Sequence, residues 1–199
     1  MNGATPSGDP LAGLRSTLLD PEHAIGMEVK GGKKEAAVLV PVYDWPNSPG
    51  LLMTERRADL RRHAGEISFP GGRRDQGEHL VDTALREAEE EIGLPAGEVE
   101  VIGALPPVGT FVTGYRINAF VGVIGAPESL ALSPNPDEVE AILRAPLGGL
   151  LDTRTQRRVP QSKIPLRTDT FEAEGRLIWG ATARILSHFC ELVEDPRRL

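Results

Sequence analysis

The chain is poor in cysteine and in aromatic residues: it has one cysteine, Cys190, among 199 residues, and aromatic side chains make up 5%. A single cysteine excludes an internal disulfide framework and a zinc site built from cysteines. Neither is needed for stability, because a chain of this length buries roughly 70% of its unfolded surface on folding. Long apolar runs are also lacking, since the longest, residues 36–42, is too short for a membrane-spanning helix.

The N-terminal residues 1–9 have neither the basic start nor the apolar run of a secretory signal. They are rich in glycine, serine, proline and asparagine, and we expect them to be disordered. Residues 10–199 show no repeat and no linker-like boundary, which predicts a single domain. We therefore expect a cytoplasmic protein without a membrane partner, and the sequence is compatible with a monomer or a homodimer.

Charge is distributed unevenly along the chain. The net charge of −7 argues against a protein that coats nucleic acid, because such proteins carry a net basic face. A basic segment runs into an acidic one, and the two meet at Gly71 and Gly72. Residues 75–100 hold nine acidic residues against a single arginine, Arg86. The arginines of the basic segment are Arg56, Arg57, Arg61, Arg62, Arg73 and Arg74. Either these charges mix on a solvated surface, or arginines hold an anion and carboxylates hold a metal that the anion shares.

The hydrophobic pattern predicts an α/β domain with a mixed sheet, because strands and helices alternate loosely along the chain. The expected strands cover residues 36–43, 51–54, 99–105 and 117–124, with a short apolar segment at 67–69 before a turn at 70–72. The expected helices cover residues 11–19, 78–92, 135–143 and 179–193.

The predicted helix over 78–92 gathers three glutamates on one arc. At 100° per residue, Glu87, Glu90 and Glu91 span about 100° beside an apolar stripe, and Arg86 falls on the side toward solvent. The stripe consists of Val81, Ala84, Leu85, Ala88 and Ile92. Like charges within one turn repel, and Mg²⁺ or Mn²⁺ ions would offset the repulsion because hard cations prefer carboxylate oxygens. A solvated glutamate-rich face is the alternative.

This helix lies in a longer pattern that resembles the Nudix box, G-x5-E-x7-R-E-U-x-E-E-x-G-U. Gly72 is followed after five residues by Glu78, and after seven more by the run Arg86 to Leu94, so that every fixed position agrees. The resemblance implies a Nudix α/β/α sandwich that hydrolyses a nucleoside diphosphate linked to another group. It also implies that Glu87, Glu90 and Glu91 bind Mg²⁺ or Mn²⁺, with the Gly72 carbonyl as a further ligand. By the same resemblance Arg86 orients the glutamates, and Glu78 is structural or contacts a metal through water.

Residues 52–72 resemble the extension of the coenzyme A pyrophosphatase branch, which reads approximately L-L-T-x-R-S-x-x-L-R-x-H-x-G-x-x-x-F-P-G-G. The chain departs from this pattern at Met53, Arg57 and Glu66. Arg56, Arg61, His63 and the turn Phe69-Pro70-Gly71-Gly72 are in place. The resemblance implies that coenzyme A or a derivative is cleaved to 3′,5′-ADP and 4′-phosphopantetheine by direct attack of metal-activated water.

Substrate and proton-transfer roles follow as hypotheses. Arg56 and Arg61 are candidates for the 3′-phosphate of coenzyme A, since guanidinium groups bind phosphate bidentately. His63 either contacts the substrate or shapes the loop. Glu138 is the first candidate for the general base, because bases of this family often lie on a loop opposite the box, and Glu87 is the second.

Two other functions stay open at the level of sequence. A Nudix hydrolase of another nucleoside diphosphate derivative, such as ADP-ribose, a dinucleotide or a nucleotide sugar, would carry the same box. A non-catalytic nucleotide sensor on the same fold would typically have lost box glutamates, and this chain keeps all of them.

Overall fold

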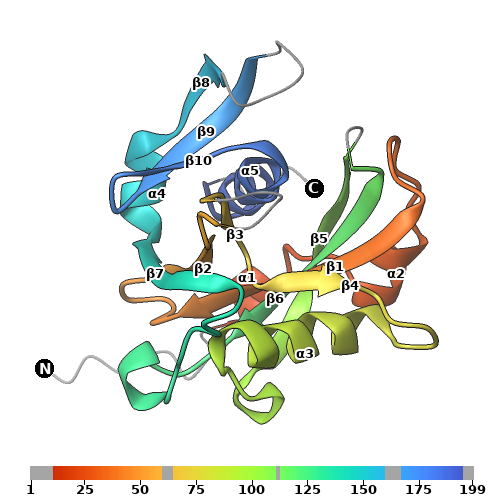
Figure 1. The fold of residues 1–199 in the computed structure, drawn as a ribbon, viewed down its shortest axis with the longest axis horizontal. Helices are drawn as coiled ribbons and strands as arrows, with labels where there is room; N and C mark the ends of the chain where they lie inside the picture. Colours follow the sequence, from red (N-terminus) through yellow and green to blue (C-terminus); the bar gives the residue numbers. More distant parts are fainter. Residues whose placement is uncertain (1–10, 60–64, 111–112, 160–166, 195–199) are drawn as a thin grey trace, which may run out of the picture.

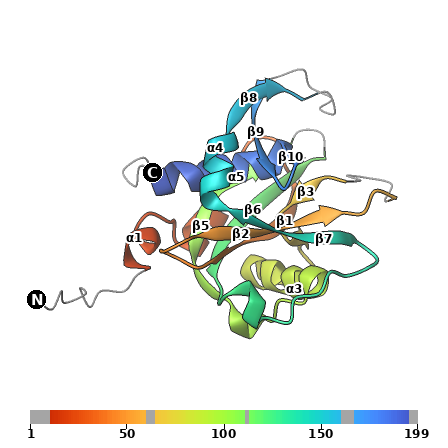
Figure 2. The same cartoon turned by 90° about the vertical axis from the view of Figure 1, so that its left-hand side faces the viewer.

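The computed structural model describes residues 11–59, 65–110, 113–159 and 167–194. Its main body has three layers, with a seven-stranded sheet between two long helices (Figures 1 and 2). Helix α3 (Leu80–Ile92) covers one face of the sheet and α5 (Gly180–Glu194) covers the other. The predicted α/β sandwich is therefore confirmed.

The main sheet is mixed, as predicted. Its strands are β1 (Lys34–Tyr43), β2 (Gly50–Arg56), β3 (Ile67–Ser68), β4 (Gly71–Arg73), β5 (Glu100–Gly109), β6 (Tyr115–Val123) and β7 (Val139–Pro146). The order is β3-β2-β1-β6-β5, with β4 also paired to β1 and β7 to β2. β1 and β6 run parallel, and the other pairs are antiparallel.

Strand β1 is buried on both faces, which explains its continuous apolar run. Val40 and Val42 pack in the core beneath α5, whereas Ala37 and Leu39 pack in the core beneath α3. Side chains of a strand alternate between the two faces, so each helix covers one half of this run.

β1 and β2 pair at one end and then diverge. They form a ladder only at Val42–Leu51 and Tyr43–Gly50. Residues 67–73 fill the opening, with β3 on β2 and β4 on β1. The Leu39 N–H donates to the Pro70 carbonyl over 2.9 Å, which continues the β1 ladder into this segment. The opening therefore places Gly71 and Gly72 in the sheet, next to β1 and beneath α3.

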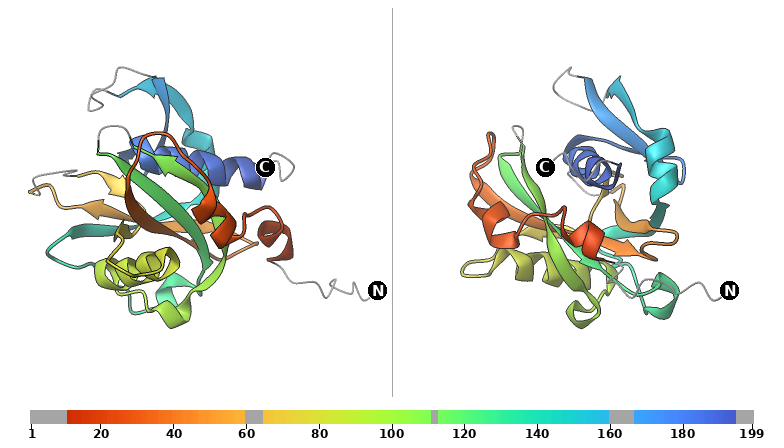
Figure 3. Two further views of the ribbon diagram at one scale, coloured as in Figure 1. Left: turned by 90° about the vertical axis from the view of Figure 1, so that its right-hand side faces the viewer. Right: turned by 180° about the vertical axis from the view of Figure 1, so that it is seen from behind.

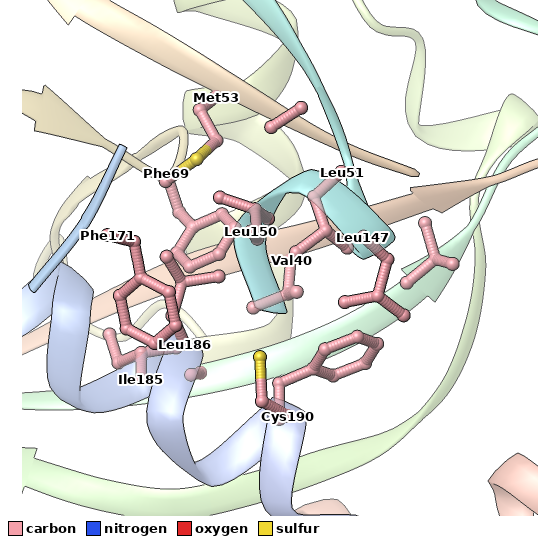
Figure 4. Packing of buried hydrophobic residues seen from close by; sticks show 14 of the residues in the cluster. Val40, Leu51, Met53, Phe69, Leu147, Leu150, Phe171, Ile185, Leu186 and Cys190 are labelled. Carbon is pink, nitrogen blue, oxygen red and sulfur yellow. The ribbon is translucent and has the colours of Figure 1, made fainter. Parts of the chain in front are cut away.

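The C-terminal part adds a three-stranded sheet beside α5. This part begins with α4 (Leu147–Thr153). The strands that follow are β8 (Thr155–Arg158), β9 (Arg167–Ala173) and β10 (Arg176–Ile178), and they pair in the order β10-β9-β8. Leu150 and Phe171 from this part meet Leu186 and Cys190 of α5 in one apolar cluster (Figure 4). Burial raises the pKa of the Cys190 thiol to about 12, in line with a core residue.

The remaining elements are α1 (Ala12–Arg15), α2 (Pro21–Gly26) and two 3-10 turns, Ala96–Glu98 and Pro127–Ser129. α2 packs against β5 and β6 (Figure 3). No helix in the described ranges is long and apolar enough to cross a membrane. The disorder expected for residues 1–9 concerns residues outside those ranges.

Two predicted helices differ from the structure. The helix expected over 11–19 is a single turn, Ala12–Arg15. The helix expected over 135–143 is wrong, because residues from Val139 onward form β7 against β2. Val139, Leu143 and Ala145 are buried between more exposed neighbours, and this period of two suits a strand.

Candidate active site

Helix α3 carries the predicted metal-binding glutamates of the candidate site, and a capping interaction is found at each of its ends. The His79 ring accepts a hydrogen bond from the Val81 N–H at the first turn, and Gly93 ends the helix with a left-handed φ of 66°. The small residues Ala84 and Ala88 are fully buried and let the helix approach β1 closely. Val81 and Leu85 are only half-buried, so the buried face is rotated from the predicted stripe toward the glutamates.

Glu91 is the most buried of the box glutamates, with 4% of its surface exposed. Its Oε2 accepts a hydrogen bond from the Gly71 N–H over 3.2 Å, and its Oε1 lies 3.6 Å from Nη1 of Arg56. Burial raises the pKa of the Glu91 carboxyl to about 7, more than the Gly71 N–H and Arg56 lower it, and Glu87 and Glu138 raise it further. Glu91 is therefore a buried acid, and a cation of high charge would be a favourable partner for its carboxylate.

The Glu87 carboxylate lies directly over Gly72. A Cβ added to Gly72 would be 2.2 Å from Oε1 of Glu87, so a glycine is required for this approach. Burial raises the pKa of Glu87, and the adjacent Arg86 opposes the shift. Two of the predicted metal ligands are thus brought together across the interface of β4 and α3.

Arg86 connects the acidic residues instead of pointing into solvent as the helical periodicity predicted. Its Nε donates to Glu78 over 2.8 Å, and its Nη1 donates to Glu87 over 3.1 Å and to Glu90 over 3.0 Å. Its Nη2 donates to the Arg73 carbonyl over 3.3 Å. The long side chain folds back along the helix, which a helical wheel of Cβ directions does not describe. Arg86 thus contacts three glutamates, and the orienting role that the box resemblance implies for it stays a prediction.

Glu78 belongs to the same network of hydrogen bonds. It accepts hydrogen bonds from Arg86, from the Thr83 hydroxyl over 2.7 Å and from the Asp75 N–H over 3.1 Å. These bonds lower the pKa of Glu78 to about 2, with Arg86 as the main cause. Glu78 is ionised at neutral pH and ties the loop before α3 to the second turn of that helix.

Arg56 reaches the site from the end of β2, and Glu138 reaches it from the loop that leads into β7. Nη1 of Arg56 lies 3.8 Å from Oε2 of Glu138, in addition to its contact with Glu91. The β2–β7 register shifts between Glu55 and Arg56, and such a bulge re-aims the side chain that follows it. The Arg57 N–H donates to the Glu138 carbonyl, and the Asn135 N–H donates to the Glu91 carbonyl. The loop that carries Glu138 is therefore tied to both β2 and the end of α3.

The structure gathers most of the predicted site residues, but not equally. They form two sets of contacts, Arg56 with Glu91 and Glu138, and Glu87 with Arg86 and Gly72. The sets meet at β4, because the Gly71 N–H donates to Glu91. Among the described residues, Glu90 pairs with Arg86 alone, and its side chain is 56% exposed. The candidates Arg61 and His63 lie outside the described residues.

The carboxylates of Glu87, Glu90 and Glu91 are of the kind that a hard divalent cation prefers, although in this structure each of them is paired with an arginine. Among the described residues, no three His, Cys, Asp or Glu side chains converge closely enough to hold one ion. Glu87 and Glu90 each bond Arg86 through one oxygen, which leaves them the other oxygen for a cation. Carboxylate oxygens are the ligands that Mg²⁺ and Mn²⁺ prefer, and a cation beside the buried Glu91 would offset its lost hydration.

Sequence reasoning missed three contributions to the site. The Gly71 N–H that binds Glu91 and the Thr83 hydroxyl that binds Glu78 depend on how β4 sits under α3. The guanidinium of Arg57, a position where the extension usually has serine, donates to the Pro136 carbonyl of the Glu138 loop. The departure at Arg57 was visible in the sequence, whereas its partner was not.

Comparisons with known proteins agree with this architecture. The family model described as NUDIX domain matches residues 33–160. The Nudix hydrolase NudL of Escherichia coli O7:K1 is 42% identical over 159 residues, which cover 77% of this chain and 79% of that protein. NudL of Escherichia fergusonii matches to the same extent. The names of these relatives specify no substrate.

Solved structures show the same fold. The Nudix hydrolase RenU of M. smegmatis superposes with a TM-score of 0.50 at 25% identity, over 61% of this chain and 75% of its own. The MutT protein of Methanosarcina mazei Go1 superposes with a TM-score of 0.53 at 15% identity, over 84% of this chain and all of its own.

Proposed function

The chain belongs to the Nudix hydrolase family, and from this premise we propose that it hydrolyses the diphosphate bond of coenzyme A and its derivatives. The products are 3′,5′-ADP and 4′-phosphopantetheine. The observation that carries the proposal is the contact of Arg56 with Glu91, over 3.6 Å. This contact joins the segment that resembles the coenzyme A pyrophosphatase extension to the Nudix box.

Glu87, Glu90 and Glu91, with the Gly72 carbonyl, are the residues that would hold Mg²⁺ or Mn²⁺. When bound, such cations would neutralise charge on the diphosphate and lower the pKa of a water molecule. Arg86 holds Glu87 and Glu90 in position through the two hydrogen bonds of its Nη1. Its own position depends on Glu78.

In the proposed reaction a water oxygen attacks one phosphorus atom and the bond from that phosphorus to the bridging oxygen breaks. The water proton passes to a carboxylate, for which Glu138 is the first candidate because its half-exposed side chain faces Arg56 at the edge of the site. Glu87 is the second candidate. Arg56 contacts the substrate, and Arg61 and His63 are proposed as further substrate contacts.

The test is a comparison of coenzyme A, dephospho-coenzyme A and ADP-ribose, with product analysis by chromatography in Mg²⁺, in Mn²⁺ and in a chelator. We expect cation-dependent release of 3′,5′-ADP, with coenzyme A turned over fastest. Faster turnover of ADP-ribose would keep the reaction type and refute the substrate. No turnover of any of the three would refute the proposal for this set of substrates and favour a nucleotide sensor.

A further inference from the structure

A second charged feature lies beyond the acidic site, at the end of β4 opposite Arg56. It is a cleft of about 530 Å³ between the start of β1, the start of β6 and the loop that leads into α3. In Figure 1 these segments meet on the side of the molecule where α2 lies. Five cationic side chains line this basic cleft, against the two acidic ones of Glu35 and Asp75. The cations are Lys33, Lys34, Arg73, Arg74 and Arg116.

Three of these cations are already engaged within the protein. Arg74 forms an ion pair with Glu35 and donates from Nε to the Glu78 carbonyl over 2.6 Å. Arg116 donates to the carbonyls of residues 24 and 25 in α2. The Lys34 ammonium lies 5.7 Å from the centre of the Tyr115 ring. These contacts hold the walls of the cleft in place.

Lys33 and Arg73 are exposed and available to a ligand. Neither side chain forms an ion pair or a side-chain hydrogen bond with another residue in the described part of the chain. Because the Arg74–Glu35 pair neutralises itself, Lys33 and Arg73 leave the cleft positive, although the whole protein carries −7. Such a cleft attracts anions, and a guanidinium beside an ammonium favours phosphate.

The basic cleft adjoins the acidic site along the chain. The Glu87 carboxylate rests on Gly72, and the next two residues of the chain, Arg73 and Arg74, line the cleft. Two residues of extended strand cover roughly 7 Å. Successive side chains of a strand alternate between its faces, so Arg74 shares the face on which Glu87 covers Gly72, whereas Arg73 starts on the other face and reaches the cleft from there. This spacing would let a nucleotide whose diphosphate lies at Glu87 and Glu91 place a second phosphate group in the cleft.

We propose that the basic cleft binds a phosphate monoester of the substrate that lies outside the bond to be cleaved. The proposal rests on the proposed function, because in coenzyme A this group is the 3′-phosphate. Lys33 and Arg73 are the residues that read it. Arg56, which faces Glu91 and Glu138, is then left to the diphosphate.

The experiment uses the variant Lys33→Gln/Arg73→Gln. Its matched control is Lys30→Gln/Arg158→Gln, which changes the net charge equally at exposed residues that do not line the cleft. In the cleft variant we expect KM for coenzyme A to rise at least tenfold, with kcat and the kinetics of dephospho-coenzyme A unchanged. The control variant should behave as the unaltered protein.

Binding of 3′,5′-ADP and of 5′-AMP in a chelator separates this proposal from the proposed function. Calorimetry should show at least tenfold tighter binding of 3′,5′-ADP to the unaltered protein, and the cleft variant should lose that difference. Equal affinities for the two nucleotides, or equal losses in the variant, would overturn the cleft assignment even if coenzyme A is hydrolysed. An intact binding difference without hydrolysis of coenzyme A would overturn the proposed function and support the cleft.

Discussion

The contact between Gly72 and Glu87 allows the site to be tested with a single methyl group. A Cβ added at Gly72 would lie 2.2 Å from Oε1, 2.3 Å from Cδ and 2.5 Å from Oε2 of Glu87. Atoms in van der Waals contact are about 3.5 Å apart or more, so the carboxylate must withdraw by roughly 1 Å. Gly72→Ala should therefore displace a proposed metal ligand.

The two consequences of this substitution differ in size. A displacement of about 1 Å in a catalytic site lowers kcat on the order of 100-fold. The cost in unfolding free energy should stay near 1 kcal/mol, because the group that moves is the end of a flexible side chain. We expect a nearly inactive protein that melts close to the unaltered one.

Gly71 provides the contrast, because it lies in the same strand but meets backbone. Its added Cβ would lie 2.4 Å from the Ala37 carbonyl oxygen and 2.6 Å from Cα of Val38. A sheet backbone cannot withdraw as a side chain does, so Gly71→Ala should lower the unfolding free energy by roughly 3 kcal/mol. Gly97→Ala is the neutral control, since its added Cβ meets no described atom within 4 Å.

Thermal melting and steady-state hydrolysis of the best substrate at saturating Mg²⁺ distinguish these outcomes. Near-normal kcat in a folded Gly72→Ala protein would refute the role of Glu87 at this position. A Gly72→Ala protein that is as destabilised as Gly71→Ala would show that the contact supports the fold and would leave the loss of activity without a catalytic meaning.

Three further predictions concern the acidic network. Glu91→Gln should abolish turnover and leave the fold intact, and near-normal rates at saturating Mg²⁺ would contradict its assignment as a ligand. The metal-free protein should lose roughly 3 kcal/mol of unfolding free energy between pH 4.5 and about pH 8, because folding raises the Glu91 pKa to about 7 and favours the protonated acid. Urea denaturation of Glu91→Gln should show no such loss of unfolding free energy over this pH range. If Glu91→Gln keeps the pH dependence of the unaltered protein, Glu91 is not its cause. Glu78→Gln should cost about 2 kcal/mol at neutral pH, and this deficit should shrink as the pH falls from 4.5 toward 2, where the native Glu78 takes up its proton. A deficit that stays constant over that range would point to packing and not to charge.

The parts of the fold that the sequence predicted are those set by local chemistry. The apolar run of β1 is buried on both faces, and Gly93 ends α3 in the left-handed conformation. Residues 139–146 show the limit. Their burial alternates with a period of two, but the proline-rich residues before them obscured that period, and pairing with β2 decides the outcome. Strands β8, β9 and β10 were not predicted, because β9 packs against α4 and α5, and β8 and β10 depend on pairing with β9.

Some features of the candidate site could likewise be predicted from the sequence, and others could not. The spacing of Glu87 and Glu91 on one helix follows from the helical period. The contact of Arg56 with Glu91 does not, because it requires β1 and β2 to diverge and residues 67–73 to enter between them. The basic cleft depends on pairing between residues that are still farther apart in the sequence, since the parallel pairing of β1 with β6 brings Arg116 opposite Glu35.

The opening between β1 and β2 places the charge boundary at Gly71 and Gly72 next to the carboxylates of α3. Residues 67–73 lead from the basic segment to the acidic segment of the sequence. Cations therefore lie beyond each end of the row of carboxylates on α3. Arg56 stands at one end beside Glu91, and Lys33 and Arg73 stand at the other end in the basic cleft. A diphosphate held at Glu87 and Glu91 through divalent cations would then have cationic side chains on either side. In a chain with a net charge of −7, this arrangement favours a substrate that carries a further phosphate group besides its diphosphate, because the diphosphate alone would need only one of the two basic regions.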